Sequence, residues 1–142
     1  MRQNFHLIVV GGGHAGCEAA AAASRVGAKT ILITASKSAL GRMSCNPAIG
    51  GIAKGHLVME IDALGGIMGV AADKAAIQYR VLNRSKGSAV WSPRAQCDRD
   101  HYSNVISDTM MGYDNLIITA GMVSSLITNL NRCYGVNLED GS

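Results

Sequence analysis

Residues 9–18 read VVGGGHAGCE, a glycine-rich turn between two apolar runs that decides the fold. The run before it, 5–10, is short, apolar and ended by glycine, and predicts a buried strand. The run after it, 15–26, is rich in alanine and predicts a helix, which ends at Gly27. Residues 29–33 are rich in β-branched side chains and predict a second strand. Together these runs predict a βαβ unit with parallel strands and a right-handed crossover.

Three glycines of this turn, Gly11, Gly13 and Gly16, stand at the spacing G-x-G-x-x-G. In a βαβ unit the first allows the tight turn, the second lets a diphosphate approach the backbone, and the third lets the helix pack close to the strand. The helix start also offers unpaired amides and a partial positive charge. This context predicts a dinucleotide-binding loop. The alternative is a glycine turn that only packs a helix on a sheet.

The loop lacks the acidic residue that would bind a ribose hydroxyl of NAD. The end of the second predicted strand holds Thr34, followed by Ala-Ser-Lys. An NAD-specific site is therefore not favoured, and a hydroxyl or the backbone would have to bind the ribose. His14 fits either a polar residue at the helix start or an imidazolium beside phosphate. Cys17 fits a small core residue.

Length and composition predict one globular domain over residues 1–142. Hydrophobic residues make up 48% and charged residues 16%, which excludes a disordered chain. The net charge of +3 is too small to indicate nucleic-acid binding by itself. The four cysteines form no C-x-x-C pair, so we expect free thiols and no metal site. Because no signal peptide, transit peptide or apolar span is recognisable, we expect a cytoplasmic protein without a membrane partner; a mitochondrial location is the alternative.

The rest of the chain predicts an α/β fold: a three-layer, Rossmann-like parallel sheet with a small antiparallel strand pair. Segments 36–54 and 85–93 are expected to be irregular. The elements expected by periodicity are a helix at 56–63, a strand at 77–82, a helix at 94–111, a strand at 116–119, and paired strands at 122–130 and 132–138.

The basic residues between 54 and 99 are scattered, and most are expected to be solvated surface. Arg94 and Gln96 follow Pro93 at the start of a predicted helix, where a ligand contact is more credible.

Residues 41–56, GRMSCNPAIGGIAKGH, form the most unusual stretch of the chain. A long irregular loop in a compact domain is often functional. Cys45 precedes a predicted helix start, and Arg42 and Lys54 are close in sequence. Both features favour a thiolate.

At this point the sequence resembles a known family. GGGHAGCEAA, MSCNPAIGGIAKGH, EIDALGG, LNRSKG and PRAQ are similar to the amino-terminal part of the glucose-inhibited division protein A family, from about Leu7 to about Gly135. That family is the flavin subunit of tRNA uridine 5-carboxymethylaminomethyl modification. The folate- and flavin-dependent tRNA (uracil-5) methyltransferases are related, and MSCNPAIGG favours the former family.

The resemblance implies that the dinucleotide is FAD, and that Val123 contacts its adenine through the backbone. In the family, reduced flavin helps to transfer a one-carbon unit from methylenetetrahydrofolate to C5 of the wobble uridine of tRNA. NADH supplies the electrons, a GTPase partner subunit is required, and a homodimer is expected at full length. The residues implied to hold FAD are Gly11, Gly12, Gly13, His14, Ala15 and Gly16.

Cys45 matches a cysteine proposed as a catalytic thiol in that family. Thiolate attack on C6 of a uracil ring would make C5 nucleophilic, which is reasonable chemistry beside a flavin. The alternative is a buried cysteine in a loop that packs on the cofactor.

The resemblance also implies a truncated, amino-terminal portion, because the family's later flavin contacts and tRNA-binding helices have no counterpart here. We expect such a portion to be inactive alone and to bind FAD poorly. The alternatives are a generic FAD/NAD(P)-binding oxidoreductase domain and a non-catalytic remnant.

Overall fold

The computed structural model describes residues 4–44 and 46–141, which pack into two compact units. The first unit combines the chain up to Leu40 with the chain from Met111 onwards, and the second unit spans 41–110. This division does not decide whether residues 1–142 belong to one FAD-binding domain, so that prediction stays a prediction.

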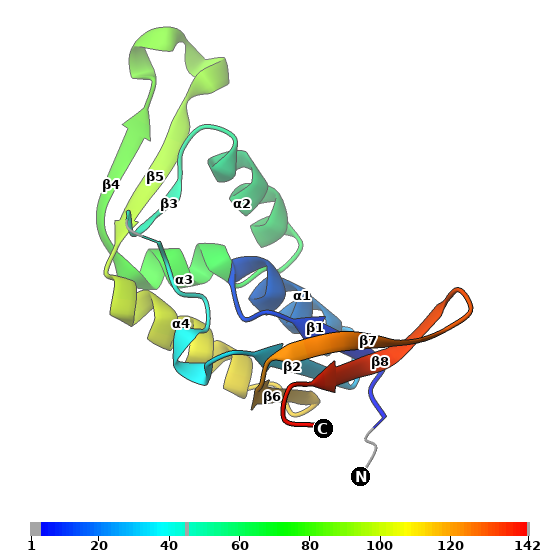
Figure 1. Ribbon diagram of the computed structural model, residues 1–142. Helices are drawn as coiled ribbons and strands as arrows, with labels where there is room; N and C mark the ends of the chain where they lie inside the picture. The colour runs from blue at the N-terminus through cyan, green and yellow to red at the C-terminus, as the bar shows by residue number, and fades with distance from the viewer. Residues whose placement is uncertain (1–3, 45, 142) are drawn as a thin grey trace. The chain divides into compact units, whose positions relative to one another are not determined.

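The first unit is built on a parallel sheet with the strand order β1-β2-β6 (Figure 1). The central strand β2 contains only threonine, isoleucine and leucine, and its Leu32 and Ile33 are buried. The predicted βαβ unit with parallel strands is therefore confirmed. The elements are β1 (Leu7–Val10), α1 (His14–Arg25), β2 (Thr30–Thr34), the 3-10 turn η1 (Lys37–Ala39) and β6 (Leu116–Ala120).

Helix α1 packs on this sheet through small side chains. Its buried residues are Cys17, Ala20, Ala21 and Ser24, which lie on one face at helical spacing. The Ser24 hydroxyl is accommodated there because it donates to the Ala20 carbonyl at 2.8 Å. Small side chains allow the helix to lie close to the strands, as the alanine-rich run predicts.

An antiparallel hairpin follows β6 in the first unit (Figure 1, orange to red). It consists of β7 (Val123–Asn129) and β8 (Arg132–Leu138), which confirms the predicted strand pair. Leu130 forms the turn with a φ of 51° and is 96% exposed.

The second unit holds an antiparallel sheet with the order β3-β5-β4. Helices α2 and α3 pack on one face of this sheet, and the β4–β5 hairpin ends in two 3-10 turns (Figure 1). Among the described residues no single helix is long and apolar enough to span a membrane; α2 and α3 reach that length only together, across a 111° bend. The elements are β3 (Ala48–Gly50), α2 (Lys54–Ala63), α3 (Met68–Ala75), β4 (Ala76–Leu82), η2 (Arg84–Lys86), η3 (Ser88–Val90), β5 (Ser92–Cys97) and α4 (Arg99–Met111).

The structure corrects the prediction of a helix over 94–111. Residues 94–97 belong to β5, the central strand of the second sheet, and the helix begins only at Arg99. Asp98 sets that boundary, because its carboxylate accepts the backbone N–H of His101 at 2.8 Å as a helix cap does. Strand pairing with β4 outweighs the local helical pattern of this segment.

Two short elements are absent from the sequence predictions. Strand β3 lies within 36–54, which was expected to be irregular, and helix α3 follows the glycine pair at 65–66. Both are defined by tertiary contacts: β3 pairs with β5, and α3 buries its alanine face. The other predicted elements, 56–63, 77–82 and 116–119, are confirmed as α2, β4 and β6.

We predict that Asn115 stabilises the first unit by joining the start of β6 to the end of α1. Its Nδ2 donates to the carbonyl oxygens of Ser24 at 3.0 Å and Ala28 at 2.9 Å. Because Asn115→Ala removes both bonds, the free energy of unfolding in urea should fall by about 1–3 kcal/mol. Asn104→Ala, at an exposed position of α4, is the control and should change it by less than about 0.5 kcal/mol. Equal losses would contradict the assignment.

Candidate functional site

The candidate site lies at the carboxyl edge of the parallel sheet in the first unit. The loops after β1, β2 and β6 leave the sheet together at this edge, because Gly11 N–H donates to the Ile33 carbonyl at 2.8 Å and Gly121 N–H to the Thr34 carbonyl at 2.9 Å. Open parallel sheets bind ligands at this edge. The topology therefore brings the glycine loop, the end of β2 and the segment leading to Val123 to one place.

The three glycines of the loop have the backbone geometry that the sequence pattern predicts. Gly11 has a φ of +103°, which favours glycine, and forms the turn out of β1. A Cβ at Gly13 would meet no atom within 4 Å, so the space above its backbone is open. A Cβ at Gly16 would overlap the carbonyl oxygen of Gly11. One glycine thus shapes the turn, one leaves room for a ligand, and one permits close packing.

Gly12 has a packing role that the sequence pattern does not reveal. A Cβ there would lie 2.7 Å from Thr34 Oγ1 and 2.9 Å from Leu40 Cδ2. The Gly12 carbonyl also accepts a hydrogen bond from Cys17 Sγ at 3.3 Å. Cys17 is 1% exposed, so its interpretation as a small core residue fits the structure.

The start of α1 suits an anionic group. Gly13 is the N-cap residue, no side chain caps the helix, and the first turn contains no acidic residue. Backbone amides at such a helix start attract phosphate or carboxylate oxygens. His14 is half-buried and Ala15 is exposed at this point. The arrangement can bind a diphosphate through the backbone.

Ser36 is a residue at this edge that sequence reasoning did not single out. Thr34, the residue at the position where an acidic side chain was expected, is buried, and its hydroxyl donates to the Ser36 carbonyl at 3.3 Å. The Ser36 hydroxyl lies 2.8 Å from that of Ser38 in an exposed pair. A hydroxyl for a ribose is thus available two residues after β2. The sequence signal for Ser36 is its position two residues after the end of the second strand.

Of the remaining predicted residues, Val123 and Lys54 are described by the structure and Cys45 is not. Val123 begins β7, half-buried and paired with Leu138, two residues beyond Gly121. Its contact with adenine stays a prediction. Cys45, the candidate thiol, lies outside the described residues. Lys54, which was expected to favour its thiolate, donates from Nζ to the Ala48 carbonyl at 3.3 Å.

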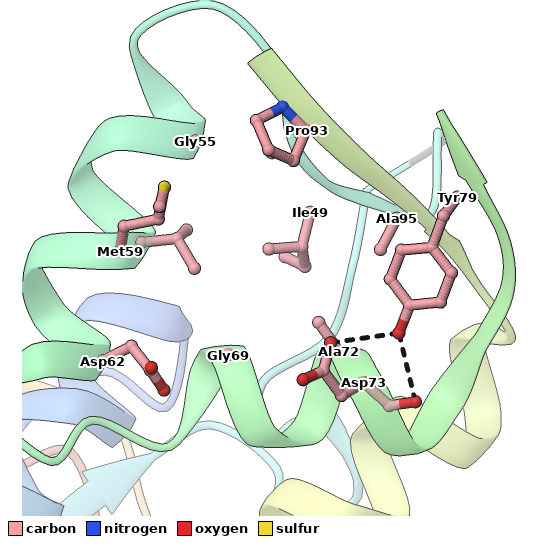
Figure 2. Close-up of a pocket in the computed structure, with 12 residues that line it drawn as sticks. Ile49, Gly55, Met59, Asp62, Gly69, Ala72, Asp73, Tyr79, Pro93 and Ala95 are labelled. Carbon is pink, nitrogen blue, oxygen red and sulfur yellow. Dashed lines mark hydrogen bonds between the residues drawn. The ribbon is translucent and has the colours of Figure 1, made fainter. Parts of the chain in front are cut away.

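The second unit contains a separate pocket of about 200 Å³ between its sheet and helices α2 and α3 (Figure 2). Figure 2 shows apolar side chains around it, together with the Asp62, Asp73 and Tyr79 side chains. Pockets for drug-sized ligands start at roughly 300 Å³. This cavity is therefore suited to a small group, and the described residues that line it include two carboxylates, Asp62 and Asp73.

Tyr79 acts in this pocket as a hydrogen-bond donor. Its hydroxyl donates to Asp73 Oδ1 at 3.0 Å (Figure 2). The hydrogen bond to the carboxylate is the main cause that raises the pKa of Tyr79 above its usual value of 10.0. The phenol therefore keeps its proton at neutral pH, and it cannot serve as a general base there.

Cys97 has the properties of a structural cysteine. It is 1% exposed, and desolvation by burial is the main cause that raises the pKa of its thiol. A protonated, buried thiol is a poor nucleophile. Among the described cysteines, Cys17 is also buried, and only Cys133 is exposed.

Comparison with known proteins gives the family. The model of the family glucose inhibited division protein A matches residues 6–142. The chain belongs to this family. It is 54% identical over 141 residues to the tRNA uridine 5-carboxymethylaminomethyl modification enzyme MnmG of Zymomonas mobilis. The matched region covers 99% of this chain and 23% of that protein. The resemblance seen in the sequence motifs is thereby confirmed.

Solved structures agree with the GidA assignment. Aquifex aeolicus GidA superposes with a TM-score of 0.94 at 48% identity, over 99% of this chain and 23% of that one. A probable FAD-dependent monooxygenase of Pseudomonas aeruginosa, PqsL, has a TM-score of 0.66 at 14% identity over 99% of this chain and 40% of its own, which shows the fold alone. The predicted mixed α/β fold with a parallel sheet and antiparallel pairs is confirmed. The chain spans about a quarter of the GidA relatives' length.

We predict that Gly13 and Gly16 of the glycine loop differ in their contribution to stability. Gly13→Ala should leave the free energy of unfolding nearly unchanged, because its φ of −72° and the open space tolerate a methyl group. Gly16→Ala should lower the free energy of unfolding by about 1–3 kcal/mol, because the helix must move off the Gly11 carbonyl. Chemical denaturation of both variants checks this. Equal destabilisation would contradict the geometry.

We predict that the described thiols differ in reactivity. In a Cys45→Ser background, iodoacetamide should label Cys133 first, and Cys17 and Cys97 at least about tenfold more slowly, because both are buried. Peptide mass spectrometry over time measures each rate, and labelling in urea, where the three rates should converge, is the control. Rapid labelling of Cys97 in the folded protein would contradict its burial.

Proposed function

We propose that this chain supplies the FAD-binding amino-terminal part of an enzyme that modifies C5 of the tRNA wobble uridine. The observation that carries the proposal is the open backbone at Gly13, at an uncapped helix start on the carboxyl edge of the sheet. This feature occurs in a chain 54% identical to a tRNA uridine 5-carboxymethylaminomethyl modification enzyme. The chain matches only 23% of that enzyme, so we assign the activity to the full-length enzyme and only FAD binding to this part.

The residues at the edge of the first unit fit a flavin dinucleotide. In this proposal the amides of His14, Ala15 and Gly16 bind the diphosphate, the Ser36 hydroxyl binds the adenosine ribose, and the Val123 backbone contacts the adenine. Gly12 keeps Thr34 close to the loop, and so positions Ser36. When bound, the flavin supplies redox chemistry. NADH as reductant and methylenetetrahydrofolate as one-carbon donor are parts of the same proposal.

Cys45 is the proposed nucleophile toward the uracil ring. Its thiolate adds to C6, and the electron pair of the C5–C6 double bond then makes C5 nucleophilic. After C5 gains its carbon substituent and loses its proton, elimination of the thiolate restores the double bond. The described cysteines support this choice, because Cys17 and Cys97 are buried and Cys133 lies in β8, away in sequence from both glycine-rich loops.

The proposal extends to partners and location. It includes tRNA as substrate, a GTPase partner subunit, a homodimer at full length and a cytoplasmic location. The tRNA substrate, the partner subunit and the homodimer are what the family resemblance implies, and the cytoplasmic location is the expectation from the sequence, with a mitochondrial location as the alternative. Each is tested separately from cofactor binding.

We predict that this chain can replace the matching segment of Zymomonas mobilis MnmG. The chimera should purify with flavin absorbance and modify tRNA that carries a wobble uridine, as measured by nucleoside mass spectrometry. Gly13→Ala in the chimera should lower flavin affinity by roughly tenfold or more, because the methyl group occupies the diphosphate approach. Cys45→Ser should retain flavin and lose modification, and Cys133→Ser should retain both.

The outcomes separate the alternatives. A flavin-containing chimera that oxidises NADH but leaves tRNA unmodified would indicate a generic oxidoreductase domain. A folded chimera without flavin would indicate a non-catalytic remnant. Full modification by Cys45→Ser would remove that thiol from the mechanism.

A further inference from the structure

The β4–β5 arm, residues 76–97, concentrates the positive charge of the chain. It contains four basic residues, Arg80, Arg84, Lys86 and Arg94, and none of the 10 acidic residues. Its formal charge of +4 exceeds the +3 of the whole chain, so the remainder is slightly acidic. A local excess of this kind on one projecting hairpin attracts polyanions even where the overall charge does not.

Two of these residues, Arg80 and Arg94, are placed against each other on the sheet. They are direct cross-strand partners in the antiparallel pair of β4 and β5. Like charges in such positions repel and destabilise the pairing. Within the described ranges, neither guanidinium has a hydrogen bond or an ion pair with a carboxylate. The pair therefore costs stability in the absence of an anion.

Amide side chains complete a hollow around the two guanidinium groups. Gln78 and Gln96 are cross-strand neighbours one row away on the same face. Together with Leu82, these four side chains line a depression of about 120 Å³. The hollow is on the face opposite Ile49, Tyr79 and Ala95, which line the pocket under the two helices.

The chemistry of this hollow matches phosphate oxygens. Guanidinium groups donate paired hydrogen bonds to phosphate, and carboxamides add neutral donors. A bound anion would also relieve the repulsion between Arg80 and Arg94. The arm contains no acidic residue, so its charge favours an anion over a metal cation at this face.

The arm favours an extended phosphate chain over a single diphosphate. Arg84 and Lys86 lie in η2 at the tip, beyond the end of β4 at Leu82. At about 3.4 Å per strand residue, these cations lie on the order of 10 Å from the pair. Trp91 is 49% exposed beside them, and its indole N–H donates to the Arg84 carbonyl at 3.3 Å, which holds the tip together. Aromatic faces beside cations are typical of surfaces that bind nucleic-acid strands.

We propose that the β4–β5 arm docks RNA, with a phosphodiester group held between Arg80 and Arg94. The choice of tRNA as the RNA rests on the proposed function. The arm is distinct in sequence from the dinucleotide loop, and its role is to bind the substrate backbone without sequence specificity. Arg84 and Lys86 extend the same contact toward the tip.

The test compares Arg80→Gln/Arg94→Gln with Lys29→Gln/Arg132→Gln, a control with the same charge change in the first unit. Binding of fluorescently labelled tRNA transcript to the purified chain is followed by anisotropy over a range of salt concentrations. The Arg80/Arg94 variant should bind roughly tenfold or more weakly, and the slope of log affinity against log salt should fall by about 1.4–1.8. The control should change either value far less. The thermal midpoint of the Arg80/Arg94 variant should be equal or higher, because a repulsive pair is removed.

Several results would overturn the proposal. Unchanged tRNA affinity and salt slope would do so, as would equal losses in the control or no salt-dependent binding by the unmodified chain. A lower thermal midpoint with unchanged binding would assign the pair a structural role. In the MnmG chimera, the Arg80/Arg94 variant should retain its flavin; loss of flavin with unchanged tRNA affinity would assign the pair to the cofactor diphosphate. If the unmutated chimera lacks flavin and activity while the arm still binds tRNA, the proposed function fails and the docking surface stands.

Discussion

The close approach of Gly16 to the carbonyl oxygen of Gly11 is the constraint on which the first unit depends. This contact lets α1 begin directly above the turn that leaves β1, so its first amides point over the carboxyl edge of the sheet. The buried alanines of α1 continue the same close packing along the helix. Gly13 then remains the one loop position with open space above it on an extended backbone. Cofactor binding, in this account, follows from packing between a helix and a strand.

The two surfaces proposed here use different kinds of donor. The dinucleotide loop offers backbone amides. Side-chain substitutions therefore alter its binding little, except at the glycines. The β4–β5 arm offers guanidinium side chains on a paired strand, where each charge can be removed without altering the backbone. In these two proposals, the loop binds a diphosphate through backbone geometry, and the arm binds the phosphates of an RNA through charge, at some cost in stability.

Much of the first unit could be predicted from sequence because its determinants are local. A glycine turn, a helix of small residues and β-branched strands follow one another within 30 positions, and each is read by its own periodicity. The second unit is harder to predict from sequence, because strands β3 and β5 are stabilised by antiparallel pairing with residues distant in the sequence. Residues 94–97 follow a proline and precede a true helix, so local pattern extended that helix backwards. The pairing of Arg80 with Arg94 could not be seen until Arg94 was placed on a strand. The sequence left open whether a hydroxyl or the backbone would bind the ribose, because the lengths of β2 and of the turn after it, which place Ser36, are set by tertiary packing.

The most direct test of the central claim is a titration of the isotope-labelled chain with ADP, followed by amide chemical shifts. ADP carries the adenosine and diphosphate of FAD without the flavin. We expect the largest shift changes at the amides of residues 13–16, with smaller changes near Ser36 and Val123. Changes confined to residues 46–110, or none at the start of α1 at saturating ADP, would contradict the claim that this helix start binds the diphosphate.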